Sequence, residues 1–136
     1  MDLERFVTAQ DSGGTYRRAA AELRTGRKTS HWMWFIFPQI AGLGRSAMVE
    51  AYAIRDLTEA QAYLAHPVLG PRLIECAEIV ASHRRLSAEQ IFGGIDAIKL
   101  RSSMTLFAHA DPDQEVFRQV IDQNFDGPDP ETERRI

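Results

Sequence analysis

The sequence predicts an all-α protein, a compact single domain of about seven short helices. Apolar residues recur at spacings of three and four along most of the chain, and that spacing places them on one face of a helix. Runs with the alternating pattern of half-buried strands are almost absent. Ser, Asp and Gly residues flank the periodic segments, where helix caps are expected.

In the N-terminal half, a first helix is expected over residues 3–10, and the glycine-rich residues 11–14 end it. A second helix begins at about Thr15 and ends at Gly26, which suits a left-handed cap. Ser46 is the expected N-cap of the next helix, and Thr58 that of the helix after it.

In the C-terminal half, Pro71 is the expected first residue of a helix that reaches His83. Ser87 and Gln90 form a capping-box pattern for a short helix. Asp96 is the expected cap of a long helix that ends at His109, and a last helix covers residues 113–125.

Residues 32–40 are the one segment that the period does not assign. They contain both tryptophans and read equally as a short extended segment or a buried helical turn. Pro38 disfavours helical backbone at Phe37, so a helix here ends near Ile36. Ser30 is its expected N-cap.

Length and composition predict one domain, residues 1–125, followed by an acidic, mobile tail over residues 126–136. The formal charge of −3 argues against general binding of nucleic acid or of an acidic membrane. Cys76 is the single cysteine, no basic start precedes an apolar run, and no apolar stretch approaches the roughly 20 residues that span a bilayer. We therefore expect a soluble, cytoplasmic protein.

Residues 42–47, "GLGRSA", satisfy the local pattern of a dinucleotide-binding turn. A Rossmann domain needs several buried parallel strands, and the sequence offers at most one. The narrower hypothesis is that the helix start at Gly44, with Arg45 beside it, holds a phosphate or carboxylate. The alternative is that Gly42 and Gly44 serve only a tight turn.

Two further groups of candidates suggest an anion pocket. Lys99, Ser102 and Ser103 lie about one helical turn apart, with Arg101 between them. The alternative for Lys99 or Arg101 is a salt bridge to Glu22 or Asp96.

The second group precedes and includes the aromatic segment. Arg27, Lys28 and His31 offer positive charge or hydrogen bonds, and Trp32 or Trp34 offers a ring to a planar ligand. The alternative is that both indoles belong to the core.

Neither a metal site nor a cofactor is predicted. The four histidines, at positions 31, 66, 83 and 109, are widely separated, and there is no second cysteine. Ser30 and His31 are neighbours in sequence, but a nucleophile and its base must meet through the fold, so their adjacency does not indicate a catalytic pair.

Residues 21–47, 63–76 and 91–107, and the spacing between them, resemble an uncharacterised bacterial family, domain of unknown function 1810. The likeness extends to about Phe125. It implies a compact, mainly helical single domain without an established activity. Some relatives carry the label calpastatin, but the calpain inhibitor of that name is largely disordered, and this composition is globular.

Residues 42–45 and the late helix with its basic and Met, Leu and Phe residues are also similar to the NADAR superfamily. That resemblance implies a link to NAD or ADP-ribose metabolism and cleavage of N-glycosidic bonds. It assigns no catalytic carboxylate here, and Glu22, Glu50 and Glu75 all remain open.

The leading hypothesis is a domain that binds a small anionic, nucleotide-like metabolite between the aromatic segment and the Lys99 helix. If it is an enzyme, the expected reaction is N-glycoside hydrolysis. The alternatives are a protein-interaction module and a purely structural role for the charges. A shared concave pocket for Arg45, Lys99 and His31 favours the ligand site, whereas scattered positions and an apolar patch elsewhere favour the interaction module.

Overall fold

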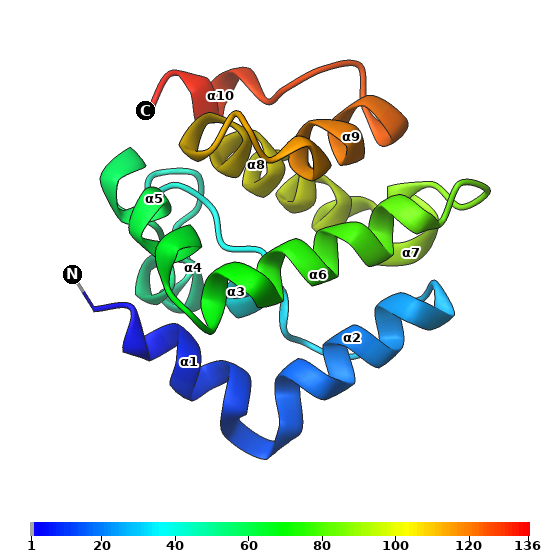
Figure 1. Ribbon diagram of the computed structural model, residues 1–136, viewed down its shortest axis with the longest axis horizontal. Helices are drawn as coiled ribbons and strands as arrows, with labels where there is room; N and C mark the ends of the chain where they lie inside the picture. Colours follow the sequence, from blue (N-terminus) through cyan, green and yellow to red (C-terminus); the bar gives the residue numbers. More distant parts are fainter. Residues whose placement is uncertain (1) are drawn as a thin grey trace.

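The protein is all-α, as predicted. The structure, a computed structural model, describes residues 2–136. They form ten α-helices and one 3-10 turn (Figure 1). The helices of the first half are α1 (Glu4–Asp11), α2 (Thr15–Thr25), α3 (Met33–Ile36), α4 (Ala47–Ala51) and α5 (Leu57–Ala65), with the turn η1 (Ser12–Gly14) between α1 and α2. Those of the second half are α6 (Leu69–Ser82), α7 (Ala88–Phe92), α8 (Gly94–Ala110), α9 (Glu115–Asn124) and α10 (Pro130–Glu133).

Helix α8 is the centre of the packing. It contacts α5, α7, α9 and α10, and every residue from Ser102 to Ala108 is buried. A helix that is covered on all sides needs no polar stripe, which explains why buried residues run continuously along its second half. In Figure 1, α1 and α2 form a V at the lower edge, α6 crosses the middle, and α10 lies at the upper edge.

The unassigned aromatic segment is a helical turn, α3, followed by extended chain. Trp32 is the N-cap residue, with no side-chain cap, so the expectation that Ser30 caps this helix is wrong. Ile40 pairs with Ile54 in an isolated parallel bridge. Two backbone hydrogen bonds of 2.8 Å make the bridge, from Ala41 N to Ile54 O and from Ile54 N to Gln39 O.

Several predicted helix ends are confirmed. Ser46 caps α4 by accepting a hydrogen bond from Val49 N, and Ser87 with Gln90 forms the predicted capping box of α7. Gly26 ends α2 with a left-handed φ of 82°. Because these signals are local, sequence alone identifies them.

Three other predicted starts are displaced. The cap of α5 is Asp56 rather than Thr58, since the Asp56 carboxylate accepts from Glu59 N. Helix α6 begins two residues before Pro71, at Leu69. Helix α8 begins at Gly94, so Asp96 lies inside its first turn and binds lysines instead of capping.

Residues 126–136 are predicted as a mobile tail. In the structure they include helix α10, which packs against α8. Asp129 caps α10, and Thr132 is fully buried. The guanidinium of Arg101 donates to the carbonyls of Gly127 and Pro128. Polar contacts hold this segment, which is why the absence of an apolar period was misleading. Among residues 2–136, no helix is both long and apolar enough to cross a membrane.

Candidate functional site

The first turn of α8 gathers several of the predicted site residues around one carboxylate. Asp96 Oδ2 lies 2.9 Å from Lys28 Nζ, and Asp96 Oδ1 lies 3.6 Å from Lys99 Nζ. The Lys28 side chain is 8% exposed and that of Lys99 24%. The predicted alternative of a Lys99–Asp96 salt bridge is thus present, and it leaves part of the Lys99 side chain open to solvent.

The two tryptophans have different roles. Lys28 Nζ lies 5.1 Å from the centroid of the Trp32 ring, and Lys99 Nζ lies 5.8 Å from that of Trp34. Trp32 is fully buried, so its ring cannot stack on a ligand. Trp34 is half-buried. Of the two predicted stacking residues, Trp34 alone stays accessible.

Glu22 fastens the chain that leads into the aromatic segment. Its Oε1 accepts from Thr29 N at 2.7 Å, Ser30 N at 3.0 Å and Trp32 Nε1 at 3.0 Å, and its Oε2 accepts from the Ser30 hydroxyl at 2.6 Å. Partial burial opposes ionisation, but these hydrogen bonds outweigh it and lower the pKa of Glu22 to about 2. The carboxylate is therefore a structural anion.

A cavity of about 330 Å³ opens beside Lys99. Lys99 and Ser102 enter it from α8, and Gln39 and Gly44 from the loop around α4. Its remaining lining is apolar or acidic: Leu43, Val49, Ile95, Ile98, Asp129 and Glu131. We call this cavity the Lys99 pocket. It brings together three predicted site residues, Gly44, Lys99 and Ser102.

The two carboxylates of the Lys99 pocket already have polar partners. Asp129 Oδ2 accepts from the hydroxyls of Ser102 at 2.9 Å and Thr132 at 2.6 Å. Burial opposes the shift, but these bonds hold the pKa of Asp129 below its usual range. Glu131 pairs with Arg134 and Arg135. Lys99 is the one cationic side chain among the described residues that line the pocket.

The other predicted residues do not enter the Lys99 pocket. Arg27, His31 and Arg45 are exposed and lie outside its lining. Arg101 holds the C-terminal segment and lines a neighbouring cavity. Ser103 is fully buried, and its hydroxyl has no hydrogen-bond partner in the described chain. Ser103 therefore faces the core, although it lies only one helical turn beyond Lys99.

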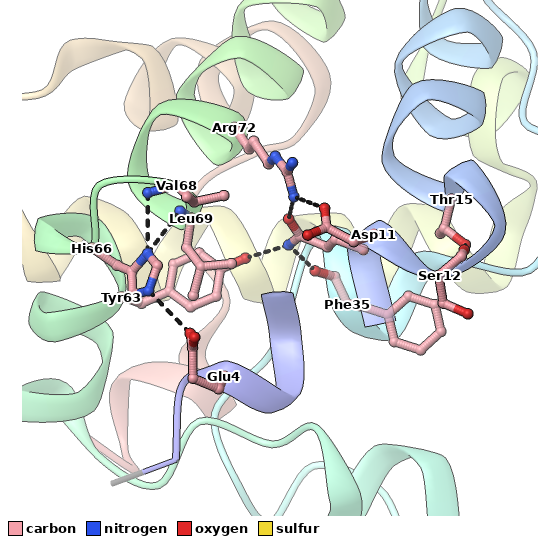
Figure 2. Close-up of polar contacts among 11 residues, drawn as sticks. Glu4, Asp11, Ser12, Thr15, Phe35, Tyr63, His66, Val68, Leu69 and Arg72 are labelled. Carbon is pink, nitrogen blue, oxygen red and sulfur yellow. Dashed lines mark hydrogen bonds and ion pairs between the residues drawn. The ribbon is translucent and has the colours of Figure 1, made fainter. Parts of the chain in front are cut away.

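A second polar cluster was missed by the sequence analysis (Figure 2). Gln10, 1% exposed, donates to the Phe35 carbonyl at 2.7 Å and to the Tyr63 hydroxyl at 3.2 Å. Its carbonyl accepts from Arg72 Nη1 at 3.2 Å. Burial raises the pKa of the Tyr63 phenol, which therefore stays protonated. A glutamine in the apolar stripe of residues 3–10 was the available signal.

His66 is a further structural residue that the sequence did not reveal. Its Nδ1 accepts from Val68 N at 3.1 Å and Leu69 N at 3.3 Å, which satisfies the start of α6 (Figure 2). The ring proton therefore sits on Nε2, which faces Glu4 Oε2 at 3.3 Å. The imidazole replaces a side-chain cap, and this is why α6 begins before Pro71.

The comparison with protein families decides the relationship of the chain. A family described as a protein of unknown function, DUF1810, matches residues 1–136. The chain belongs to the DUF1810 family. No curated protein matches the chain.

A solved structure supports the same DUF1810 fold. The conserved hypothetical protein Rv1873 from Mycobacterium tuberculosis is 49% identical, with a TM-score of 0.92. The match covers 96% of this chain and 93% of that one. The DUF1810 match also includes residues 126–136, where the resemblance seen in the sequence stopped short.

Proposed function

We propose that this DUF1810 protein binds a small anionic, nucleotide-like metabolite in the Lys99 pocket. The observation that carries the proposal is the placement of one partly exposed ammonium group at a concave, mostly apolar wall. Asp96 Oδ1 and the Trp34 ring lie near Lys99 Nζ, and the Lys99 side chain also lines the cavity.

Lys99 is the group of the pocket that would meet an anion. Glu131 is paired with Arg134 and Arg135, and Asp129, which stays ionised, accepts hydrogen bonds from the Ser102 and Thr132 hydroxyls. Lys99 shares Asp96 with Lys28, which makes two ammonium groups for one carboxylate. A ligand phosphate or carboxylate would accept a charge-assisted hydrogen bond from the Lys99 ammonium.

The shape and lining favour a ligand with a planar apolar part. Leu43, Val49, Ile95 and Ile98 supply an apolar wall, while the Gln39 amide and the Ser102 hydroxyl supply polar contacts. This mixture is typical of small-molecule sites, whose volumes run from about 300 to 1,000 Å³. At about 330 Å³, the pocket suits a mononucleotide-sized compound better than a dinucleotide.

The proposal includes no hydrolytic step. Glu22, Glu50 and Glu75, the carboxylates open after the sequence analysis, do not line the Lys99 pocket. The carboxylate of Glu22 already accepts four hydrogen bonds, and that of Glu75 pairs with Arg24 at 2.8 Å. N-glycoside hydrolysis therefore has no available acid or base among these three residues.

A protein-interaction surface is the second candidate, and one observation favours it. Ile95 and Ile98 are 74% and 67% exposed on α8, and both line the Lys99 pocket and also a second cavity of about 550 Å³. Exposed apolar side chains beside hollows are typical of docking surfaces. A photo-crosslinking residue substituted at Ile98, with the exposed position Glu78 of α6 as control, tests this candidate.

The ligand proposal is tested by thermal shift with AMP, ADP-ribose, NAD and ribose 5-phosphate, since selective binding to the folded state raises Tm. We expect a saturable rise with AMP that Lys99→Met reduces to the rise given by inorganic phosphate alone. Arg27→Gln, which removes an exposed cation outside the pocket, should retain the rise. No rise at millimolar ligand, or an equal rise in Lys99→Met, overturns the proposal.

A further inference from the structure

A separate cavity of about 480 Å³ lies where α1 turns into α2. Its lining is almost entirely polar: Gln10, Asp11, Gly14, Tyr16, Arg17 and Arg72. The α1–α2 turn is at the lower edge of Figure 1, whereas α8 and α10, which border the Lys99 pocket, are in the upper half. We call this cavity the hinge pocket, and it shares no lining residue with the Lys99 pocket.

Arg72 is held in place at the hinge pocket from two sides. Its Nη1 lies 2.9 Å from Asp11 Oδ1 and donates to Gln10 Oε1 at 3.2 Å. The guanidinium carbon lies 4.7 Å from the centroid of the Tyr16 ring, which covers one face of the group. Both arrangements orient the guanidinium, and its Nε and Nη2 groups donate to no side chain or carbonyl of the described chain.

Gln10 fixes this orientation from the core. Its amide nitrogen donates to the Phe35 carbonyl and the Tyr63 hydroxyl, and its carbonyl oxygen accepts from Arg72 Nη1. A buried side chain with both ends satisfied is rigid. The floor of the hinge pocket is therefore formed by side chains that are held in fixed positions.

Arg17 adds a second guanidinium on the opposite element, α2. It is exposed and forms no described hydrogen bond or ion pair within residues 2–136. Asp11 is the single acidic residue that lines the cavity, and its side chain is 57% exposed. Two guanidinium groups against one carboxylate leave an excess positive charge at the hinge pocket.

We propose that the hinge pocket binds the oxyanion of a small metabolite, a phosphate or carboxylate group, between Arg72 and Arg17. The free Nε–H and Nη2–H of Arg72 form the planar fork that matches two oxygens of such a group. Arg17 supplies the second charge. Asp11, which occupies Nη1, leaves that fork open. This site is independent of the ligand proposed for the Lys99 pocket.

The test is an NMR titration of the ¹⁵N-labelled full chain with inorganic phosphate and, separately, with acetate, at constant ionic strength in sodium chloride. We expect saturable shifts in the low-millimolar range at the Nε–H signals of Arg17 and Arg72 and at the Tyr16 amide. The tighter of the two anions identifies the group, phosphate or carboxylate, that the pocket prefers.

Two substitutions and two controls decide the outcome. Arg17→Gln removes an exposed, unpartnered side chain and should weaken binding about tenfold with the fold intact. Arg72→Lys keeps the charge but removes the fork, and a similar loss is expected. Arg27→Gln, just beyond the C-terminal end of α2, and Lys99→Met should bind as the parent protein does.

The proposal is overturned by shifts that stay linear with both anions, or by shifts that added chloride reproduces. It is equally overturned if Arg17→Gln binds as tightly as the parent protein. Lys99→Met tests the Lys99 pocket, and Arg17→Gln tests the hinge pocket. The nucleotide-specific effect should be lost in the first variant and the oxyanion effect in the second, so the two proposals succeed or fail separately.

Discussion

Glu22 and Asp96 are two carboxylates near the tryptophans, and their surroundings differ: Glu22 accepts from Trp32 itself, whereas Asp96 pairs with the lysines beside Trp32 and Trp34. Glu22 accepts four hydrogen bonds, from the backbone N–H groups of Thr29 and Ser30, from the Ser30 hydroxyl and from the Trp32 indole. Asp96 holds two lysines, and one of them, Lys99, extends into a cavity. The hydrogen bonds of Glu22 are all made within the protein, whereas the Lys99 ammonium held by Asp96 can still donate into the cavity.

The comparison shows how similar charges come to have different roles. A carboxylate whose donors are all backbone and neighbouring groups shapes the chain, and removing it leaves those donors without partners. A cation held at the edge of a cavity contributes little to stability, because its ion pair is partly solvated. Stability and binding measurements on matched variants therefore separate the two roles.

The largest expected effect is from Glu22→Ala. Three N–H donors and the Ser30 hydroxyl lose their acceptor, which should lower the free energy of unfolding by about 3 kcal/mol. Urea denaturation measures this loss, with the exposed Glu78→Ala as a control within about 0.5 kcal/mol of the parent protein. A loss no larger than that of the control would remove the distinction between Glu22 and a surface glutamate.

The second prediction concerns pH. The pKa of Glu22 is lowered from 4.5 to about 2 in the folded protein, so its contribution is fully present above the unfolded value and is lost as the pH falls through the folded value. Between about pH 5 and pH 2, the parent protein should lose stability more steeply than Glu22→Gln. Parallel denaturation curves test this, because the shift at Asp129 is common to both proteins. Identical slopes would contradict it.

Asp129 is expected to behave like Glu22 although it lines the Lys99 pocket. Its carboxylate caps α10 and accepts from Ser102. Asp129→Ala should therefore cost about 1–2 kcal/mol through the lost cap and hydrogen bonds. Denaturant unfolding measures the cost, and Asp126→Ala, an exposed residue of the same segment, is the control. Unchanged stability would place Asp129 with Lys99 as a residue free to meet a ligand.

The smallest expected effect on stability is from Lys99→Met. Its pair with Asp96 spans 3.6 Å and is partly exposed, so the free energy of unfolding should change by about 0.5 kcal/mol or less. The same variant should lose the part of the thermal response to AMP that inorganic phosphate does not produce. A large loss of stability in urea, comparable to that of Glu22→Ala, would make Lys99 a structural residue and erase the contrast.

Much of the fold could be predicted because its signals are local. The helical period and caps such as Ser46 and Ser87 are visible within a few residues. The start of α6 was not, because its cap is His66, and histidine is not one of the residue types that usually cap a helix. The C-terminal helix was missed because its segment is held by Arg101 and Ser102 of another helix.

The candidate site was predicted in part. Lys99 and Ser102 lie one turn apart on α8, so their shared face followed from spacing alone. Arg27 and His31 were grouped with them because they precede the aromatic segment, but side-chain direction depends on the fold, and both point to solvent outside the pocket. The Gln10–Arg72 contact joins residues 62 positions apart, and no local pattern reports such a distance.

The Ile40–Ile54 bridge has a consequence for how the length of this chain can change. Two backbone hydrogen bonds close the base of the loop that contains α4, and both isoleucines are buried. The hydrogen bonds at the base of the loop, and not its tip, therefore hold together the chain ends that lead from α3 and into α5. Closing a somewhat longer loop costs little entropy. Insertions between positions 42 and 46, before α4 begins and away from the hydrogen bonds of Arg5 to the carbonyls of Ala51 and Ala53, should therefore be tolerated, and they would resize the wall that Leu43 and Gly44 give the pocket.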